Sequence, residues 1–476
     1  MRAQPYDYLT SRAKSDPEGF LYIGPDRKVS NSSALEFTQQ LATYFQNIGV
    51  RRGDVVALNL PASLHILFML ASWHENCISS VFGEAIANQK VLKPDWLFSS
   101  QKYPESAATN VVLVDESVIN KIESLTPSRA CLPYESEEDI CRVLFSSGTT
   151  GTPKGVPISL KENQLRALRR NKTKISGTNQ MTLFDFGSIG GYGTFFNQYI
   201  CGESYILPGV APTNLKQIFS NNVRYLSSSI NRIIELLDYI EFNNLEVPEI
   251  EKVSIGGASA SPELMKRIKR ILGAETFNIY ASTEAGFIAY RNWESSNPFE
   301  MGKIFDDLIL EIVDTEDNKV ATDEIGVIRI KSPDQSKGYF RDLESTEKYF
   351  KNGWFYIGDF GRINPDGLLF LEGRMSEVIN FGGIKIDPAK LDHFIVGKCM
   401  VEDAGSFSFY DAQGIERLGL AVVSKSAIDK NVILNEITSQ FGVARPNEVY
   451  QVEIIPRNSQ GKVERLKLRE LLTSGQ

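Results

Sequence analysis

The sequence predicts an α/β protein with a large first domain and a smaller second domain, on three observations. Short apolar runs alternate with helical patterns along most of its 476 residues, as in layered α/β architectures. The chain exceeds the roughly 250–300 residues that one hydrophobic core supports. From Ile325 onward short β-hairpins dominate, and a compact α+β section follows Arg374. We therefore predict an N-terminal domain over residues 1–375, with layered sheets and helices and a β-rich subdomain, and a C-terminal domain over residues 376–476.

The elements of the first part are read from apolar runs and their boundary residues. Residues 53–60 predict a buried strand, and residues 61–75 predict the helix that follows it. Residues 142–146 predict a strand that leads into a glycine-rich segment. Residues 253–257 predict a strand ending at a Gly-Gly pair, after which Ser261 can cap a helix that begins with Pro262. Residues 276–280 predict one more strand.

The elements of the second part are shorter. Residues 326–332, 353–363 and 367–374 predict strands, the last two joined by a turn at 365–367. The C-terminal section predicts a hairpin around Gly382 and Gly383 and a helix capped by Asp387. Strands near 418–424 and 448–455 and a helix near 463–472 complete it.

Composition and charge exclude several classes of function. The net charge is −8, with 51 basic and 59 acidic side chains, so there is no basic footprint for nucleic acid. The most apolar stretch, residues 64–71, is far shorter than the roughly twenty residues that span a bilayer. The N-terminal segment lacks the apolar core of a signal peptide. We expect a soluble, cytoplasmic protein that binds no nucleic acid and has no membrane span.

Cysteine and histidine usage argues against a metal centre built on these residues. The five cysteines show no CxxC or paired spacing, which favours reduced thiols over a disulfide framework. The three histidines lie far apart in the sequence, and packing or surface roles account for them.

The strongest functional signal is the glycine-rich segment 146–155. Glycines allow close backbone approach to a ligand, while hydroxyls, N–H groups and one lysine supply donors for a polyphosphate. A Walker A loop is the obvious rival, but Pro153 precedes the lysine and Gly155 stands where Ser or Thr is required. The predicted phosphate-binding residues are Ser146, Ser147, Gly148, Thr149, Thr150, Gly151 and Lys154.

Four further motifs follow in order along the chain. They are Gly256-Gly257-Ala258, Tyr280-Ala281-Ser282-Thr283-Glu284, the strand from Trp354 to Asp359 together with Arg374, and the segment from Pro456 to Lys462. With the glycine-rich segment they make the chain resemble the adenylate-forming (AMP-binding) superfamily of acyl-CoA synthetases, adenylation domains and luciferases. The resemblance covers nearly the whole chain, and it implies that the C-terminal domain is mobile.

The resemblance implies a nucleotide site for ATP and Mg²⁺. The glycine-rich segment would hold the phosphates that leave as pyrophosphate. Thr283 would contact the α-phosphate, and Glu284 would bind magnesium, which is satisfied by few protein oxygens. Tyr280 would stack on adenine beside the backbone of residues 256–258, and the Ala281 and Ser282 pair completes that motif. Asp359 and Arg374 would bind the ribose. Without the motifs, Tyr280 could be a core aromatic and Asp359 a turn former.

The resemblance also implies two functions for the C-terminal domain. Lys462 would be the catalytic lysine that bridges the substrate carboxylate and the α-phosphate; without context it would be a solvated lysine at a helix start. After pyrophosphate leaves, the domain would rotate and present the Gly382 and Gly383 backbone as the wall of a thiol tunnel. The hinge position of the family, usually Asp or Lys, is Ser376 here, which puts the rate of rotation in doubt.

The predicted acyl site departs from the family pattern. Gly187, Ser188, Ile189, Gly190 and Ala281 are assigned to it, and Ala281 replaces the usual glycine, which would narrow the pocket. Gly187 falls where many acyl-CoA synthetases carry a histidine, and Ile189 falls where amino-acid-activating members carry an aspartate. Asp185 is close but out of step. The glycines at 190, 191 and 193 suggest room in the pocket, unless neighbouring side chains fill it.

The predicted function is that of an acid–thiol ligase. It would convert a small-molecule carboxylic acid to an acyl-adenylate with ATP and then form a thioester on CoA or on the phosphopantetheine of a separate carrier protein. The alternative is an amino-acid adenylation enzyme that loads a separate carrier protein. A third possibility, an inactive binding module, conflicts with the intact set Lys154, Thr283, Glu284, Asp359, Arg374 and Lys462.

Overall fold

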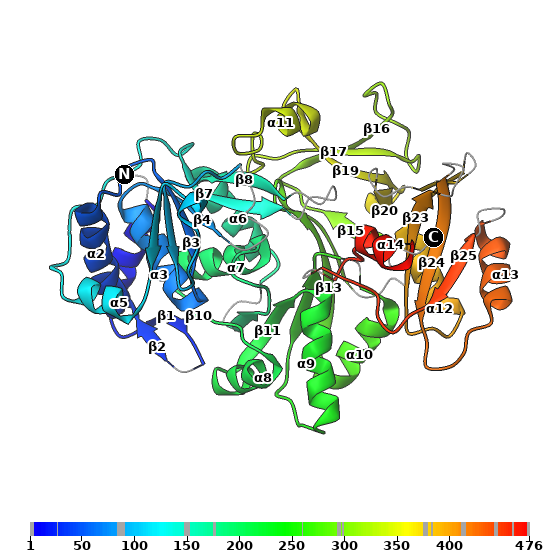
Figure 1. Cartoon of the computed structure of the whole chain (residues 1–476), viewed down its shortest axis with the longest axis horizontal. Coiled ribbons are helices and arrows are strands. Elements are labelled where there is room, and N and C mark those ends of the chain that lie inside the picture. The colour runs from blue at the N-terminus through cyan, green and yellow to red at the C-terminus, as the bar shows by residue number, and fades with distance from the viewer. Residues whose placement is uncertain are drawn as a thin grey trace.

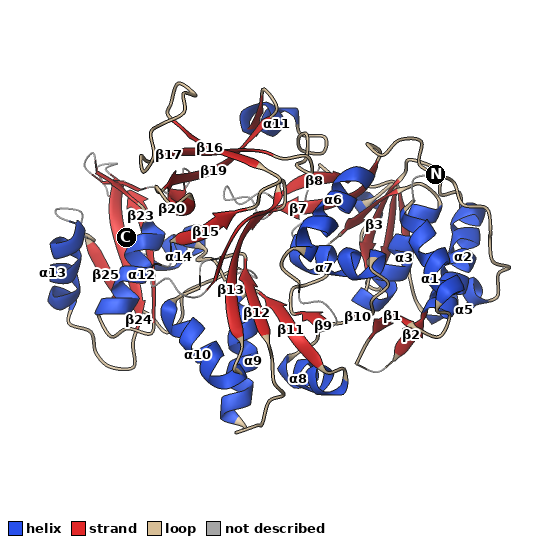
Figure 2. Ribbon diagram, turned by 180° about the vertical axis from the view of Figure 1, so that it is seen from behind, coloured by secondary structure: helices blue, strands red, loops and turns tan. Residues whose placement is uncertain are grey.

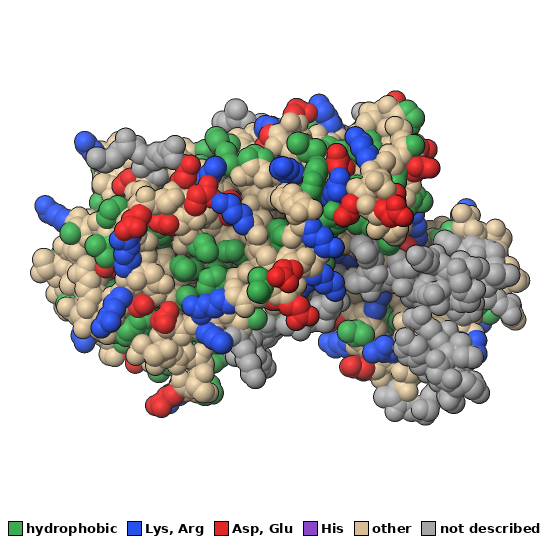
Figure 3. All heavy atoms as spheres, turned by 90° about the horizontal axis from the view of Figure 1, so that it is seen from above, with side chains coloured by type: hydrophobic (Ala, Val, Ile, Leu, Met, Phe, Trp, Pro, Cys, Tyr) green, Lys and Arg blue, Asp and Glu red, His purple; other side chains and the backbone are tan. Residues whose placement is uncertain are grey.

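The computed structural model is a mixed α/β protein, as the sequence predicts (Figure 1). It describes residues 4–25, 27–82, 91–146, 153–174, 178–258, 260–292, 297, 299–374, 379–381, 384–410, 416–441, 446–458 and 461–473. Within these ranges no helix combines the length and the apolar character needed to cross a bilayer. On the face shown in Figure 3, acidic and basic side chains are interspersed.

A six-stranded sheet forms the first layer. Its order is β6 (Asn110–Leu113), β5 (Trp96–Ser99), β3 (Val55–Asn59), β4 (Ile78–Val81), β7 (Ile140–Ser146), β8 (Lys154–Ser159). All pairs are parallel except β7 with β8. Helices α1 (Pro5–Ser15), α2 (Asn31–Ile48), α3 (Ala62–His74) and α5 (Glu116–Glu123) pack on its core, and a 3-10 turn spans Glu105–Ala107. The predicted strand at 53–60 and helix at 61–75 are confirmed.

A second, fourteen-stranded sheet runs through the centre of the molecule. Its parallel half contains β1 (Phe20–Ile23), β10 (Tyr205–Ile206), β9 (Asn179–Thr182), β11 (Val223–Ser228), β12 (Lys252–Gly256) and β13 (Glu275–Ser282), with β2 (Lys28–Ser30) antiparallel at the edge. Helices α8 (Ala211–Ser220), α9 (Ile230–Phe242) and α10 (Pro262–Leu272) lie along one side of these strands (Figure 2). Helices α6 (Leu160–Asn171) and α7 (Ile189–Ile200) lie between the two sheets (Figure 1).

The other half of this sheet is antiparallel. It contains β14 (Gly286–Asn292), β15 (Glu300–Ile304), β20 (Leu368–Arg374), β19 (Trp354–Ile363), β17 (Gly326–Lys331) and β16 (Ile309–Val313), with β18 (Phe350–Lys351) paired to β19 and helix α11 (Leu343–Tyr349) before it. The three hairpin strands predicted after Ile325 are confirmed. The change to antiparallel pairing occurs earlier than predicted, because β13 already pairs antiparallel with β14.

The C-terminal section has a sheet and a core of its own. A hairpin of β21 (Ile379–Phe381) and β22 (Ile384–Ile386) precedes α12 (Pro388–Lys398), and β23 (Asp403–Tyr410), β24 (Glu416–Val423) and β25 (Glu448–Gln451) form a three-stranded sheet with α13 (Lys430–Phe441) and α14 (Arg465–Thr473). Its buried cluster includes Leu391, Leu420 and Ile437. The predicted boundary at Met375 and Ser376 lies outside the described residues and stays a prediction.

Candidate active site

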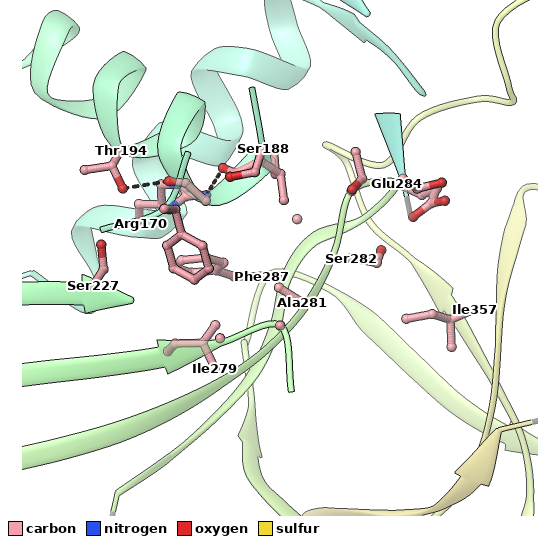
Figure 4. A pocket seen from close by; sticks show the side chains of 18 of the residues that line it. Arg170, Ser188, Thr194, Ser227, Ile279, Ala281, Ser282, Glu284, Phe287 and Ile357 are labelled. Atoms are coloured by element: carbon pink, nitrogen blue, oxygen red, sulfur yellow. Dashed lines mark hydrogen bonds between the residues drawn. The ribbon is translucent and has the colours of Figure 1, made fainter. Parts of the chain in front are cut away.

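A cavity of about 410 Å³ lies at the carboxyl ends of the parallel strands. Its wall includes Ser227 from β11, Gly256 from β12 and Ser282 from β13, and Ile357 of β19 contributes from the antiparallel half (Figure 4). The ends of parallel strands in open α/β sheets are where ligands bind, because crossover connections leave a crevice there. The cavity therefore lies beside the ends of the strands that carry the sequence motifs.

The cavity gathers residues from all five sequence motifs. Predicted site residues in its wall are Ser146, Lys154, Gly256, Gly257, Ala281, Ser282, Thr283, Glu284, Arg374 and Lys462. Pairing of β7 with β8 sets Ser146 opposite Lys154, so the two ends of the glycine-rich segment meet. The predicted residues between them, 147–151, lie outside the described residues, as do Ser376, Gly382 and Gly383. Ala258 is described but does not line the cavity.

Glu284 is the acidic residue of the cavity wall. Its side chain is only 6% exposed, and its Oε1 accepts a hydrogen bond of 2.9 Å from the Tyr339 hydroxyl. Burial, together with the charge of Glu284, raises the pKa of Tyr339, so that the phenol stays protonated and donates. A single, oriented carboxylate beside a phosphate site suits magnesium, which takes one or two carboxylates and completes its shell with phosphate and water.

The turn that carries Thr283 and Glu284 is fixed from behind by Arg166 of α6. Its guanidinium donates to the carbonyl oxygens of Thr283 at 2.8 Å and Glu284 at 2.9 Å, and also to that of Asp334. Arg166 belongs to none of the sequence motifs. The one feature of the sequence that could have indicated Arg166 is its position in the middle of the helix that follows the glycine-rich segment.

Lys154 faces the same part of the cavity between two aromatic rings. Its Nζ lies 3.8 Å from the ring centroid of Tyr349 and 5.0 Å from that of Tyr339. No carboxylate within the described ranges forms an ion pair with it. A lysine held by ring quadrupoles keeps its charge available for an incoming anion.

The predicted ribose residues, Asp359 and Arg374, form a hydrogen-bonded triad with Tyr280, the predicted adenine residue. The Tyr280 hydroxyl donates to Asp359 Oδ2 at 2.6 Å, and Arg374 Nε donates to Asp359 Oδ1 at 2.7 Å. The β19–β20 register sets Asp359 opposite Arg374. Tyr280 belongs to the buried core of the antiparallel half, and neither it nor Asp359 is part of the cavity wall. The stacking of Tyr280 on adenine stays a prediction.

Lys462 reaches the cavity from the C-terminal section. Its backbone N–H donates to Asn458 Oδ1, and the Asn458 carbonyl accepts 3.1 Å from Asn231 Nδ2 at the start of α9. Gly461 has φ 87°, a left-handed conformation that favours glycine. This turn therefore places the predicted catalytic lysine in the same cavity as Lys154 and Glu284.

The predicted acyl residues are only partly brought together. Ser188, Ile189, Gly190 and Ala281 line the cavity. Gly187 does not, because its α-carbon faces Val81, whose two methyl groups lie 3.2 Å from where a Cβ would stand. The assignment of Gly187 to the acyl site stays a prediction. Asp185 is exposed and also lies outside the wall.

The glycines of α7 do not enlarge the pocket. A Cβ on Gly190 would lie 2.6 Å from the Phe184 ring, and one on Gly191 would lie 2.3 Å from the Asp185 carbonyl oxygen. A Cβ on Gly193 would lie 2.4 Å from the guanidinium of Arg170. The missing side chains let α7 approach Phe184 and Arg170 closely, so the suggestion of extra room is not borne out.

Several cavity residues at this end were not found from sequence. They are Arg170, Thr173, Gln180, Phe184, Thr194, Asn197, Tyr225, Ser227, Ser254, Ile279 and Phe287. The one available signal was the spacing of Arg166 and Arg170, which places both on one face of a helix that follows the phosphate segment. The others come from strands and helices that meet only through the order of the sheet.

Comparisons with known proteins agree with this geometry. A family model described as AMP-binding enzyme matches residues 9–340. The 2-succinylbenzoate–CoA ligase of Geobacillus sp. (strain WCH70) is 25% identical and is matched over 99% of this chain and 98% of its own. The medium/long-chain-fatty-acid–acyl-carrier-protein ligase FadD10 of Mycobacterium tuberculosis (strain CDC 1551 / Oshkosh) is 25% identical, over 81% of this chain and 77% of its own.

The fold is also shared with solved structures. O-succinylbenzoate coenzyme A synthetase (MenE) from Bacillus subtilis, in complex with ATP and magnesium ion, superposes with a TM-score of 0.82 at 21% identity. The match covers 97% of this chain and 99% of that one. Both parts of the present chain are therefore included in the common fold.

Proposed function

This chain belongs to the AMP-binding enzyme family, and we propose that it activates a carboxylic acid with ATP and passes the acyl group to a thiol. The enzyme is an acid–thiol ligase that uses ATP and Mg²⁺, with CoA or phosphopantetheine as the acceptor. One observation carries the proposal: Lys154, Thr283, Glu284, Arg374 and Lys462 come from distant motifs and line one cavity.

In the first step, a carboxylate oxygen attacks the α-phosphorus of ATP. The bond from that phosphorus to the β-phosphate oxygen breaks, and pyrophosphate leaves. Both reactants are anions, so their approach requires fixed positive charge in a site that excludes water. Lys154 would hold the departing phosphates, Thr283 would contact the α-phosphate, and Lys462 would lie between the two anions. Pre-aligned reactants can avoid roughly 7–11 kcal/mol of entropic barrier.

Glu284 would hold the magnesium ion. The ion bound there would neutralise charge on the phosphates. The site fits this use because the carboxylate is buried, is oriented by Tyr339 and is the acidic group of the described cavity wall.

In the second step, the thiolate sulfur attacks the acyl carbon and AMP leaves as the acyl–phosphate bond breaks; the thiol proton passes to solvent. The C-terminal section would rotate between the steps, withdraw Lys462 and present residues 382 and 383 to the thiol. A relative named as a CoA ligase over nearly its whole length supports CoA as the acceptor. A relative named as an acyl-carrier-protein ligase supports a separate carrier protein as the second choice.

The acid is proposed to lack an α-amino group. An ammonium group would need a carboxylate partner, yet Glu284 is the acidic side chain in the described wall, and Asp185 lies outside it. Arg170 adds positive charge at the opposite end of the cavity from Glu284 (Figure 4). The described wall therefore offers an α-ammonium group no counter-ion besides the carboxylate that would hold magnesium.

The test is the acid-dependent exchange of labelled pyrophosphate into ATP, run over fatty, aryl, dicarboxylic and amino acids with Mg²⁺ present. We expect exchange with a subset of non-amino acids, and AMP formation when CoA is added. Exchange with amino acids only would overturn the substrate assignment. No exchange and no AMP with any acid would overturn the proposed activity.

A further inference from the structure

A positively charged side chain lies at the end of the cavity away from Glu284. Arg170 is on the last turn of α6, and in Figure 4 it lies beside Phe287, across the cavity from Glu284 and Ile357. Phe287, Ile279 and Ala281 lie between the two ends in this view. A ligand whose reacting group sits near Glu284 and Lys462 would extend along these apolar residues toward Arg170.

The Arg170 guanidinium is held in a fixed plane. Its Nη2 donates 2.8 Å to the Ile189 carbonyl oxygen, and its Cζ lies 4.3 Å from the centroid of the Phe287 ring. The absence of a side chain at Gly193 leaves space for the guanidinium, because any larger residue there would collide with it. A pre-organised fork of donors loses little entropy when it binds a planar carboxylate.

Arg170 has no carboxylate partner within the described ranges, whereas its neighbour Arg169 pairs with Asp334 at 2.8 Å and Asp307 at 2.9 Å. Burial lowers the pKa of Arg170 to about 10, which leaves the group charged at neutral pH. Arg170 is half-buried, and a charge withdrawn from water without a counter-ion is costly, so proteins seldom retain one without a use.

A second group at this end also lacks a partner. Ser227 is 8% exposed and lines the cavity, and its Oγ makes no hydrogen bond to the described residues. Figure 4 shows this hydroxyl directed toward the Arg170 side of the cavity. Thr173, Gln180, Thr194, Asn197 and Tyr225 add polar wall around it. Such a lining is unsuited to the end of an alkyl chain, because it would leave polar groups desolvated.

We propose that Arg170 and Ser227 bind a second carboxylate at the far end of the acyl substrate, so that this enzyme selects dicarboxylic acids over monocarboxylic acids. The inference rests on the proposed function, because it assumes that the reacting carboxylate lies near Lys462. It names the class of acid that the cavity described above would bind.

The experiment compares matched acids in the pyrophosphate exchange assay. Each α,ω-dicarboxylic acid is paired with the monocarboxylic acid of equal carbon number and with its own monomethyl ester, and benzenedicarboxylic acids are paired with benzoic acid. The enzymes are the parent, Arg170→Gln, Ser227→Ala and the control Lys172→Gln. Lys172 lies two residues beyond Arg170 and pairs with Asp307 at the surface, so this control removes a nearby charge outside the cavity.

We expect the parent to favour the best dicarboxylic acid by about tenfold to hundredfold in kcat/KM over both partners, as a site built for a charged group rejects analogues that lack it. Arg170→Gln should remove this preference, mainly through KM, and keep the activity toward monocarboxylic acids. Ser227→Ala should lower the preference by a few fold, and Lys172→Gln should match the parent. Ser227→Ala also provides the answer if Arg170→Gln does not fold, which thermal unfolding would reveal.

Other outcomes overturn the inference. A parent enzyme that prefers monocarboxylic acids would exclude an anion-binding site at this end of the cavity. Equal kcat/KM for monomethyl esters and dicarboxylic acids would exclude it too. Either result would leave the proposed activity unaffected. An equal loss for both members of each pair in Arg170→Gln would assign Arg170 to packing alone. No exchange with any acid would overturn the proposed activity, and this inference with it.

Discussion

Arg169 and Arg170 are adjacent in sequence but have different surroundings. Arg169 is 1% exposed and is neutralised by two aspartates, which makes it part of the interior that joins α6 to the antiparallel half. Arg170 has aromatic and carbonyl contacts and opens on the cavity. Removal of a buried partner leaves an uncompensated charge, so such pairs are structural. The side chain without a counter-ion is the better candidate for binding a ligand.

Lys462→Ala tests the lysine that the C-terminal section brings into the cavity. Removal of one group that stabilises transition-state charge costs about 10²–10³ in rate, so pyrophosphate exchange should fall by at least that factor. The thermal midpoint should be unchanged. Lys467→Ala is the matched control, because this lysine is 62% exposed on the neighbouring helix. Parent-like exchange by Lys462→Ala would show that the lysine takes no part in adenylation.

Tyr339→Phe tests the orientation of Glu284. The hydroxyl that binds Oε1 is lost while the ring over Lys154 remains. Partners that orient metal ligands typically contribute about tenfold to hundredfold in metal affinity. We expect the magnesium concentration for half-maximal exchange to rise by this factor, with acid preference unchanged. Tyr349→Phe keeps its ring over Lys154 and serves as the control; an equal shift in both variants would contradict the assignment.

At the level of elements, capping residues fix where helices begin. Ser261 accepts from the backbone N–H of Leu264, and Pro262 opens α10, as the sequence predicts. Asp387 caps α12 by accepting 2.9 Å from the Ala389 N–H. Gly373 approaches the Asp387 carboxylate so closely that a Cβ would lie 3.2 Å from it. This cap is therefore half-buried against β20, where the two parts of the chain meet.

Asp387→Asn should stabilise the protein in a pH-dependent way. Burial, the largest cause, raises the pKa of Asp387 to about 6, whereas an unfolded aspartate titrates near 3.9. The folded state favours the neutral form of Asp387. The contribution of this group to the free energy of unfolding is therefore complete below about pH 3.9 and is lost as pH rises through about 6. Asparagine keeps the capping oxygen without the charge. We expect a higher thermal midpoint than the parent at about pH 8 and no gain at about pH 4.

The control for this prediction is Asp429→Asn. Asp429 also accepts from backbone N–H groups, at the start of α13, but it is exposed. Asp429→Asn should show no comparable rise in the thermal midpoint at high pH. An equal gain for both variants, or a gain for Asp387→Asn that does not depend on pH, would refute the effect of burial.

At the level of the whole molecule, polar contacts between described residues join the C-terminal section to the first part of the chain. Asn231 Nδ2 donates to the Asn458 carbonyl, and Lys390 pairs with Glu372 of β20. A Cβ on Gly461 would lie 3.0 Å from Asn231 Oδ1. Polar contacts of this kind can be exchanged for contacts with water, which is compatible with the proposed rotation between half-reactions.

Gly461→Ala should separate the two half-reactions. The substitution strains a left-handed residue and presses on Asn231, which disfavours the docked arrangement of Lys462. We expect pyrophosphate exchange to fall at least several fold, while thioester formation from a supplied acyl-adenylate and CoA continues at the parent rate. Gly397→Ala, at an open helical position of α12, is the control. Equal loss in both half-reactions would contradict a docking effect.

The sequence predicted much of the fold because its signals are local. The strand at 53–60, the capped helix at Ser261, the turn at 365–367 and the capped helix at Asp387 depend on residues within a few positions. The acyl end could not be predicted in the same way. Tyr225 lies opposite Gln180 because β11 pairs with β9, and that order is set by packing between segments far apart in sequence.

The sequence by itself determined the α/β class and the order of the motifs. It also predicted the residues that would meet phosphate and ribose, because those roles need particular residue types at short spacing. Only the tertiary structure decided which of them share a cavity. It left Gly187 outside the cavity wall, filled the space beside the α7 glycines and brought Arg170 to the far end. These outcomes depend on which side chain fills the volume next to each backbone, a property of packing between elements that no local pattern contains.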